Sequence, residues 1–288
     1  MTIGIGALAT GVKYKPDTLV LSSDTLGSYG DAYSTSELHK MYVLPKERLY
    51  IVACDEIDRA SELVAMIQKN VEMLRHRNHG PIYDALHRAV YSYYNQRATY
   101  EVFPKFMLTP EQFRTERIED ALRDQIISEW MSFYFGCQLI VGTFADSGQA
   151  LLYMIDGSAN RRDDKSPSTV EFVKSVNFPG FAAVGSGAGN AQFWLGYRDY
   201  TLSCSPKRAV YHAYEARLMA EKSAHVNDNV ELLIATKDEH FHLTRQRPQS
   251  GEWSLGGLSE QFKKYGPQST LPLGIPRGAS KERDELFD

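Results

Sequence analysis

The sequence has few cysteines and no long apolar run, and these two absences exclude several classes of protein. The three cysteines among 288 residues are widely separated and form no CxxC pair, so we expect neither a disulfide framework nor a cysteine-rich metal site. The longest apolar stretch, residues 133–145, is too short to span a bilayer and is typical of a buried strand. No basic segment leading into an apolar one opens the chain, so no secretory signal is visible. These features favour a cytoplasmic protein that has no membrane partner.

Strong charge is also lacking. The formal net charge is -4, which gives no electrostatic reason to expect a nucleic-acid partner. The eight histidines show no HExxH or other metal-binding spacing, and His240 and His242 alternate along a predicted strand. We therefore expect no metal and no cofactor. The length and composition suit a globular chain of one large domain or two ordinary ones.

The order of predicted elements indicates an α+β protein with four layers, αββα. Alternating and apolar segments predict four strands, then two or three helices, four more strands, two helices and a closing hairpin. Two sheets with helices on their outer faces satisfy this order, whereas a parallel doubly wound fold would alternate strand and helix. The predicted strands are 2–9, 18–24, 40–44, 48–54, 135–144, 150–156, 169–176, 181–185, 229–236 and 240–245. The predicted helices are 57–75, 81–97, 109–130, 190–200 and 205–222.

Residues 1–246 are predicted to form a single domain with a helical insertion at about 98–131. The helix start in this insertion is indicated by Thr109 followed by Pro110, a capping residue and a first-turn proline. Residues 247–288 are rich in Gly, Pro and charge with little apolar periodicity, so we expect an extended or disordered tail.

Four short features lie in register along these elements. The chain opens MTIGIGALAT, with the hydroxyl of Thr2 directly behind Met1 in a glycine-alternating strand. Asp24 closes the second strand, Lys40 follows 16 residues later, and Gly185-Ser186-Gly187 forms a late strand-to-helix turn. From Thr2 to about Leu243 the chain resembles the proteasome β-subunit family of N-terminal nucleophile (Ntn) hydrolases, which includes the bacterial HslV-type peptidases. The resemblance implies the Ntn-hydrolase fold and catalytic roles for Thr2, Asp24, Lys40 and Ser186.

The chemistry gives a reason for these residue types. A threonine hydroxyl needs a base to become a nucleophile, and an α-amino group, with a pKa of roughly 7.7–8.0, is such a base near neutral pH. Removal of Met1 would place both groups on Thr2. A nearby ammonium from Lys40 favours the alkoxide-like hydroxyl and the neutral amine, and Asp24 would hold that ammonium in place.

The resemblance also implies where a substrate lies. Counting without gaps from Lys40 puts Cys54 at the position where the family has a glycine whose N–H stabilises the oxyanion, with the cysteine side chain projecting toward the cleft. An extended peptide would pair with the backbone at Gly27-Ser28 and at the end of this strand. Val52 would line the position beneath the scissile bond and Glu56 its rim, which predicts small or apolar residues before the cut.

The sequence departs from the family before the penultimate strand. Where many members carry an acid and a serine around the terminal amine, this chain offers Ser223 and Val226, or Asn227 and Asp228, and neither pair fits. The insertion and the tail are also absent from the compact family, and they are candidates for subunit contacts or for narrowing access to the site.

Each candidate residue has a plainer interpretation. Thr2 could simply start a strand, Asp24 could cap a turn, and Lys40 could be a solvated surface residue. The glycines around Ser186 could serve only to let a helix approach a sheet, or the segment could imitate a dinucleotide-binding loop. Cys54 could be the nucleophile itself, although a cysteine at an apolar strand end is more often a small buried side chain.

The leading hypothesis is a threonine-type peptidase or amidase that hydrolyses an amide through an acyl-enzyme on Thr2. A non-catalytic proteasome-like assembly subunit is the alternative, and retention of Met1 would favour it; a small-molecule Ntn acylase is a further alternative. We also expect a ring-like or stacked homo-oligomer. That expectation assumes that Tyr91, Tyr93, Tyr94 and Phe103 are exposed in excess of one core's needs.

Overall fold

A computed structural model describes residues 3–10, 16–25, 27–29, 33–35, 39–157, 171–220, 230–244, 255, 257–259 and 262. The strands are β1 (Ile3–Ala9), β2 (Thr18–Asp24), β3 (Gly27–Tyr29), β4 (Tyr33–Thr35), β5 (Met41–Leu44), β6 (Leu49–Asp55), β7 (Cys137–Phe144), β8 (Ala150–Asp156), β9 (Val173–Ser175), β10 (Phe181–Gly185), β11 (Val230–Ala235) and β12 (His240–Thr244). The helices are α1 (Ile57–Glu72), α2 (His79–Val102), α3 (Pro110–Thr115), α4 (Asp120–Met131), α5 (Ala188–Tyr197) and α6 (Pro206–Ala220), with short 3₁₀ turns η1 (Pro45–Glu47) and η2 (Phe103–Phe106).

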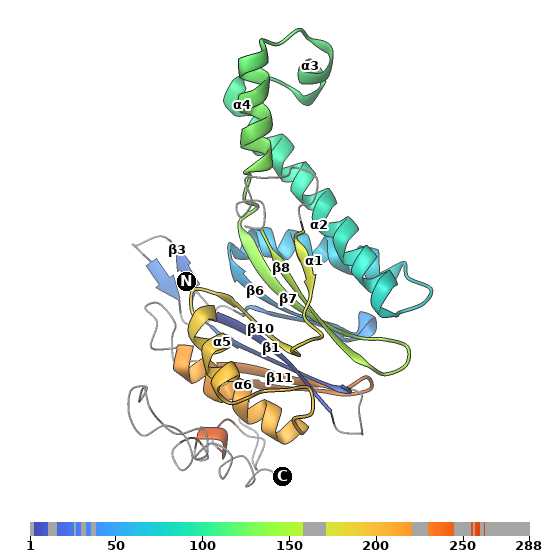
Figure 1. Cartoon of the computed structure of the whole chain (residues 1–288), viewed down its shortest axis with the longest axis vertical. Coiled ribbons are helices and arrows are strands. Elements are labelled where there is room, and N and C mark those ends of the chain that lie inside the picture. Colours follow the sequence, from blue (N-terminus) through green and yellow to red (C-terminus); the bar gives the residue numbers. More distant parts are fainter. Residues whose placement is uncertain are drawn as a thin grey trace.

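The protein is α+β, and its described strands form two five-stranded antiparallel sheets. One sheet has the order β10-β1-β2-β11-β12 and the other β5-β6-β7-β8-β9, while β3 and β4 pair as a separate hairpin. In the first sheet Ile3 lies opposite Gly185 and Gly4 lies opposite Ser23. In the second, Cys54 lies opposite Gln138. Figure 1 shows the elements in chain order.

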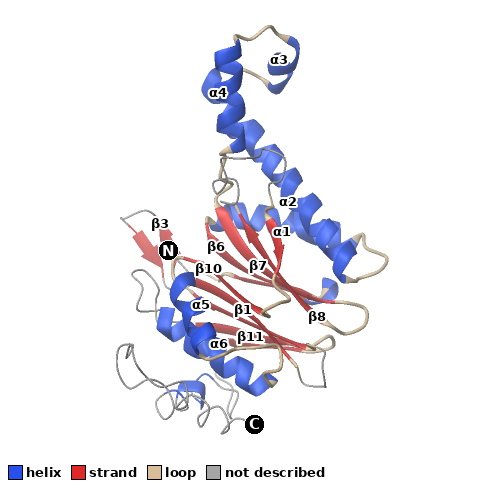
Figure 2. Ribbon diagram, in the orientation of Figure 1, coloured by secondary structure: helices blue, strands red, loops and turns tan. Residues whose placement is uncertain are grey.

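Three buried clusters define four layers. The first packs α1 and α2 on the β6–β7–β8 sheet, the second packs α5 and α6 on the β1–β2–β11 sheet, and the third fills the space between the two sheets. Figure 2 shows the two sheets lying against each other between the helical layers. Alternation along β1 explains the division, because Ile3, Ile5 and Ala7 face the helices while Gly4 and Gly6 face the other sheet.

The predicted strands are confirmed with boundaries shifted by a few residues, except that only Val173–Ser175 of the predicted 169–176 strand is described as strand. The predicted helices over 57–75 and 81–97 correspond to α1 and α2. The hairpin of β3 and β4 was not predicted, because its residues are polar and without clear alternation.

The helix predicted from Thr109 to about Trp130 is two helices. Thr109 and Gln112 form the expected capping box, but Glu116 has extended backbone and ends α3 after Thr115. No glycine or proline marks this break in the sequence. The fold-back lets Phe113 pack edge-on against Phe103, with ring centroids 5.4 Å apart. The tertiary contact therefore overrides a locally continuous helical pattern.

The insertion stands away from the sandwich. The end of α2, with η2, α3 and α4, forms a protrusion beyond the sheets (Figure 1). It has a small core of its own, in which Ala98, Val102, Phe103 and Ile126 are buried. Most of residues 98–131, the range predicted as a helical insertion, is helical.

The prediction of an extended or disordered tail is wrong for the tail residues that the structure describes. Leu255, residues 257–259 and Phe262 have helical backbone, and Leu258 is buried in the cluster beneath α5 and α6. Leu255, Leu258 and Phe262 follow one another at three- and four-residue spacing, so they share one side of this helical segment and pack on that cluster.

The argument for oligomerisation from exposed aromatics is wrong at three of its four residues. Tyr93, Tyr94 and Phe103 are at most 5% exposed, and only Tyr91 is exposed, at 54%. Tyr93 and Tyr94 face the second sheet and the protrusion base, where they contact Phe135 and Phe172. The insertion thus creates core that a compact domain lacks, and it absorbs these side chains. Among the described residues, no helix is both long and apolar enough to cross a membrane.

The contact between the sheets should depend on Gly142 of β7. A Cβ atom there would lie 2.1 Å from Cδ2 of Leu19 in the facing sheet, so the buried Leu19 side chain would have to shift in the packed space between the sheets. We expect Gly142→Ala to lower the free energy of unfolding by about 1–3 kcal/mol, measured by urea denaturation. The control is Gly189→Ala in α5, where a Cβ meets nothing within 4 Å and the free energy should stay level or rise. Equal effects of the two substitutions would contradict this account of the sheet contact.

Candidate functional site

Four strand ends meet at one end of the sandwich. The start of β1 lies between the end of β2 and the end of β10 within one sheet. A Cβ atom on Gly4 would lie 2.7 Å from Val52 and 3.3 Å from Cys54 of the facing sheet, so the end of β6 packs directly over the start of β1. The Cys54 thiol lies 3.6 Å from the carbonyl oxygen of Val184, which joins β10 to the same place.

A buried ion pair occupies this end. The Lys40 ammonium donates to Oδ1 of Asp24 at 2.8 Å, and both side chains are fully buried. The same Oδ1 accepts the backbone N–H of Ile3 at 3.0 Å. The carboxylate therefore links the lysine to the first described residue of β1. A fully buried charge is expensive unless it is paired and hydrogen-bonded, and this arrangement supplies both.

Thr2 precedes Ile3 in the chain and lies outside the described residues, as do Ser223, Val226, Asn227 and Asp228. Ser186 is described and exposed, immediately after Gly185, which pairs with Ile3. Gly185 has a φ of +89°, a conformation that favours glycine and turns the chain out of β10 toward α5.

Gln138 and Asp156 reinforce this turn, and sequence reasoning missed both. The N–H of Gly185 donates to Oε1 of Gln138 at 2.9 Å, and Nε2 of Gln138 donates to Oδ1 of Asp156 at 3.2 Å. These bonds connect β10 of one sheet to β7 and β8 of the other. The available signal was Gln138, a polar residue near the start of an otherwise apolar strand.

The direction of the Cys54 backbone N–H follows from the hydrogen bond of its neighbour Ala53. Ala53 donates to the carbonyl oxygen of Lys40 at 2.9 Å, so its N–H points toward the segment that leads into β5. Successive N–H groups of a strand point to opposite edges, so the Cys54 N–H points toward β7, where Gln138 is its partner. The next N–H on the same edge as that of Ala53 belongs to Asp55, whose φ is +72°. The Cys54 side chain is fully buried between the sheets and does not project toward an open cleft.

The Asp55 carboxylate is engaged by Tyr134, whose hydroxyl donates to Oδ2 at 2.7 Å. Burial, followed by this hydrogen bond, raises the pKa of Tyr134, so the phenol stays protonated. Burial and then the Asp55 carboxylate raise the pKa of the neighbouring Cys137 thiol. The Cys137 thiol is therefore neutral near pH 7, and it is a poor nucleophile in that form.

The predicted substrate-binding residues fall into different settings. Gly27 and Ser28 lie in β3, whose backbone alone is described. Val52 is fully buried between the sheets, so its side chain presents no surface to a substrate. Glu56 is exposed, and its carboxylate forms an ion pair with Arg59 at 2.5 Å.

A second buried carboxylate lies beside the ion pair and was not predicted. Glu231 of β11 is 1% exposed and contacts Ser23 and His39. In the sequence it stands within the apolar run VELLIA, where a single acid at a strand start is more typical of a solvated edge.

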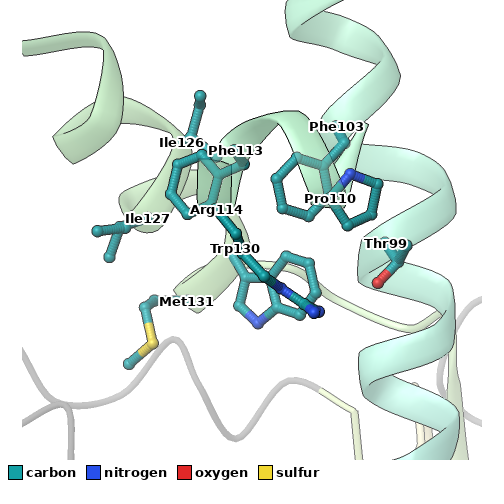
Figure 3. A pocket seen from close by; sticks show the side chains of 9 residues that line it. All are labelled: Thr99, Phe103, Pro110, Phe113, Arg114, Ile126, Ile127, Trp130 and Met131. Atoms are coloured by element: carbon teal, nitrogen blue, oxygen red, sulfur yellow. The ribbon is translucent and has the colours of Figure 1, made fainter. Parts of the chain in front are cut away.

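A pocket of about 330 Å³ lies in the protrusion, away from the strand ends. Figure 3 shows the side chains that line it, among them the aromatic rings of Phe103, Phe113 and Trp130 and the guanidinium of Arg114. It occupies a gap in the small core of the insertion and contains none of the predicted site residues.

No group of three or more His, Cys, Asp and Glu side chains in the described ranges is arranged to hold a metal ion. Neither the protein-family models nor the curated proteins include a match to this chain.

The Lys40–Asp24 pair makes a prediction about stability. Lys40→Met would leave the Asp24 carboxylate buried without its cation, and we expect it to lower the free energy of unfolding by about 3–5 kcal/mol in urea denaturation. Adding Asp24→Asn should recover most of this loss, because the amide oxygen can still accept the Ile3 N–H. Lys46→Met is the control, since Lys46 is 83% exposed in its ion pair with Glu72 and should contribute less than about 1 kcal/mol. A double variant no more stable than Lys40→Met would contradict the prediction.

Proposed function

We propose that the protein is an N-terminal threonine hydrolase of the Ntn type, a peptidase or amidase, that acts after removal of Met1. The observation that carries the proposal is the position of the Asp24 carboxylate. It holds the Lys40 ammonium and the N–H of Ile3 on one oxygen. Thr2 is bonded to Ile3, so its Cα lies within about 3.8 Å of the Ile3 Cα. This short covalent distance is the reason that we propose Lys40 as the lysine that assists Thr2.

Each residue then has a role in an acyl transfer. The neutral α-amine of Thr2 takes the hydroxyl proton while Oγ attacks the amide carbon, and the amine returns that proton to the leaving nitrogen. The ester left on Thr2 is hydrolysed by water. The Lys40 ammonium disfavours protonation of the amine and stabilises the developing alkoxide, and Asp24 keeps the ammonium in place. Ser186, at the turn that follows Gly185, is the proposed hydroxyl partner of the amine.

The oxyanion of the tetrahedral intermediate needs a backbone donor. The resemblance assigned this role to the Cys54 N–H, which points into the ladder with Gln138. The Asp55 N–H shares the edge where Lys40 lies, and we propose it as the donor. Such a donor is worth roughly 3–4 kcal/mol in comparable sites.

Two antiparallel sheets between helical layers support the Ntn fold, since a β1 that starts among strand ends is the arrangement this chemistry requires. Peptide substrates and a ring-like or stacked homo-oligomer remain part of the proposal. The oligomer now rests on the resemblance, because the aromatic side chains that were expected to be exposed are mostly buried.

The test begins with intact-mass spectrometry of the natively expressed protein, which should show loss of Met1. Thr2→Ala should reduce hydrolysis of a peptide-library substrate by about a thousandfold or more, because nucleophile activation is lost. Thr2→Ser should keep partial activity, because the hydroxyl and the amine remain. A β-lactone or vinyl-sulfone probe should add its mass to the N-terminal peptide of the wild type alone.

The control for general damage is the thermal unfolding midpoint, which should be the same in Thr2→Ala and the wild type. Retained Met1 would instead support a non-catalytic assembly subunit. Probe labelling at Cys54, or full activity of Thr2→Ala, would contradict the proposal.

A further inference from the structure

Glu231 is a buried carboxylate to which the proposed chemistry assigns no role. It lies on β11 directly opposite Ser23 of β2 and is 1% exposed. Its neighbours Leu232 and Leu233 belong to the helix-facing and inter-sheet clusters. A carboxylate in such a position lowers stability unless its contacts compensate for lost hydration.

The two contacts of Glu231 reach different parts of the chain. Oε2 accepts from the Ser23 hydroxyl at 3.4 Å, and Oε1 lies against Nδ1 of His39. The His39 side chain is 60% exposed, so this histidine is not held in place by burial. Either the neutral ring with its proton on Nδ1 or the imidazolium can donate to the carboxylate. The contact ties the segment ahead of β5 to the first sheet.

Each of the two partners of Glu231 is the chain neighbour of a member of the Lys40–Asp24 pair. Ser23 immediately precedes Asp24, and His39 immediately precedes Lys40. One buried carboxylate therefore contacts the residue before each member of the Lys40–Asp24 pair. The strand carrying Asp24 is already fixed by its ladder with β1 and β11. Lys40 instead lies just outside β5, where its carbonyl oxygen still accepts the Ala53 N–H of β6.

We propose that Glu231 is a positioning residue that acts through His39 to keep the Lys40 ammonium on Asp24. The proposal rests on the proposed function for its catalytic meaning, but the positioning itself is a property of the folded chain. Without the Glu231–His39 contact, the segment at Lys40 opens more often, and the lysine spends more time in solvent.

The direct test measures how well Lys40 is protected from acylation. Limiting N-hydroxysuccinimide acetate at pH 8 should label Lys40 slowly in the wild type, because a fully buried amine reacts only after local opening. Exposed Lys46 serves as the internal reference in the same digest, read by mass spectrometry. In Glu231→Gln we expect labelling of Lys40 relative to Lys46 to rise about tenfold, equivalent to about 1.4 kcal/mol of opening free energy.

Three further variants separate positioning from general stability. His39→Ala, at an exposed side chain, should fold normally and raise Lys40 labelling in the same direction. His39→Asn should restore protection, since its amide can donate to Glu231. Glu239→Gln changes an exposed carboxylate in the turn of the same hairpin and should leave Lys40 protected.

Unchanged Lys40 labelling in both Glu231→Gln and His39→Ala would overturn the proposal. If Glu231→Gln unfolds the protein, so that all lysines are labelled together, His39→Ala and His39→Asn decide the matter. Activity is a separate readout: kcat in His39→Ala should fall about tenfold with KM nearly unchanged. A wild type that hydrolyses nothing would refute the proposed function while leaving the protection result in force.

Discussion

The close approach of the two sheets at the start of β1 is the constraint on which the candidate site depends. Gly4 and Gly6 leave no side chain on the inter-sheet face, so Val52 and the β7–β8 side chains come within contact of the β1 backbone. This closeness brings the end of β6 to the point where β1 begins, and the end of β10 lies there too because it pairs with β1. With larger residues at these glycines, Val52 and Cys54 at the end of β6 could not lie so close to the start of β1.

Two carboxylates, Asp24 and Glu231, are buried at this end at positions one row apart in the first sheet. Folding must compensate for the lost hydration of each, and it does so with groups from segments far apart in the chain. A stability-driven core would place apolar side chains in these positions. Buried charge that joins β2, β11 and the approach to β5 is better explained as a means of specifying one arrangement of the segment that carries Lys40.

Much of this could be predicted from the sequence, for identifiable reasons. The strands of both sheets alternate or run apolar, and α1 repeats its apolar residues at three-four spacing, so local patterns suffice for them. Asp24 and Lys40 were predicted through their spacing and are found in contact. The contacts of Gln138, Asp156 and Glu231 were not predicted, because no resemblance marked these positions and their partners become visible only in the tertiary structure. The edge that the Cys54 N–H faces was not predicted, because counting residues cannot show which edge of a strand an amide faces.

The helix α2 has a mechanical consequence of its own. Its 24 residues run without interruption for about 36 Å, with the first half packed on the second sheet and the last turns in the core of the protrusion. The helix is continuous between these two parts. A force applied at the tip of the protrusion would therefore act on the second sheet through a continuous helix and not through a loop.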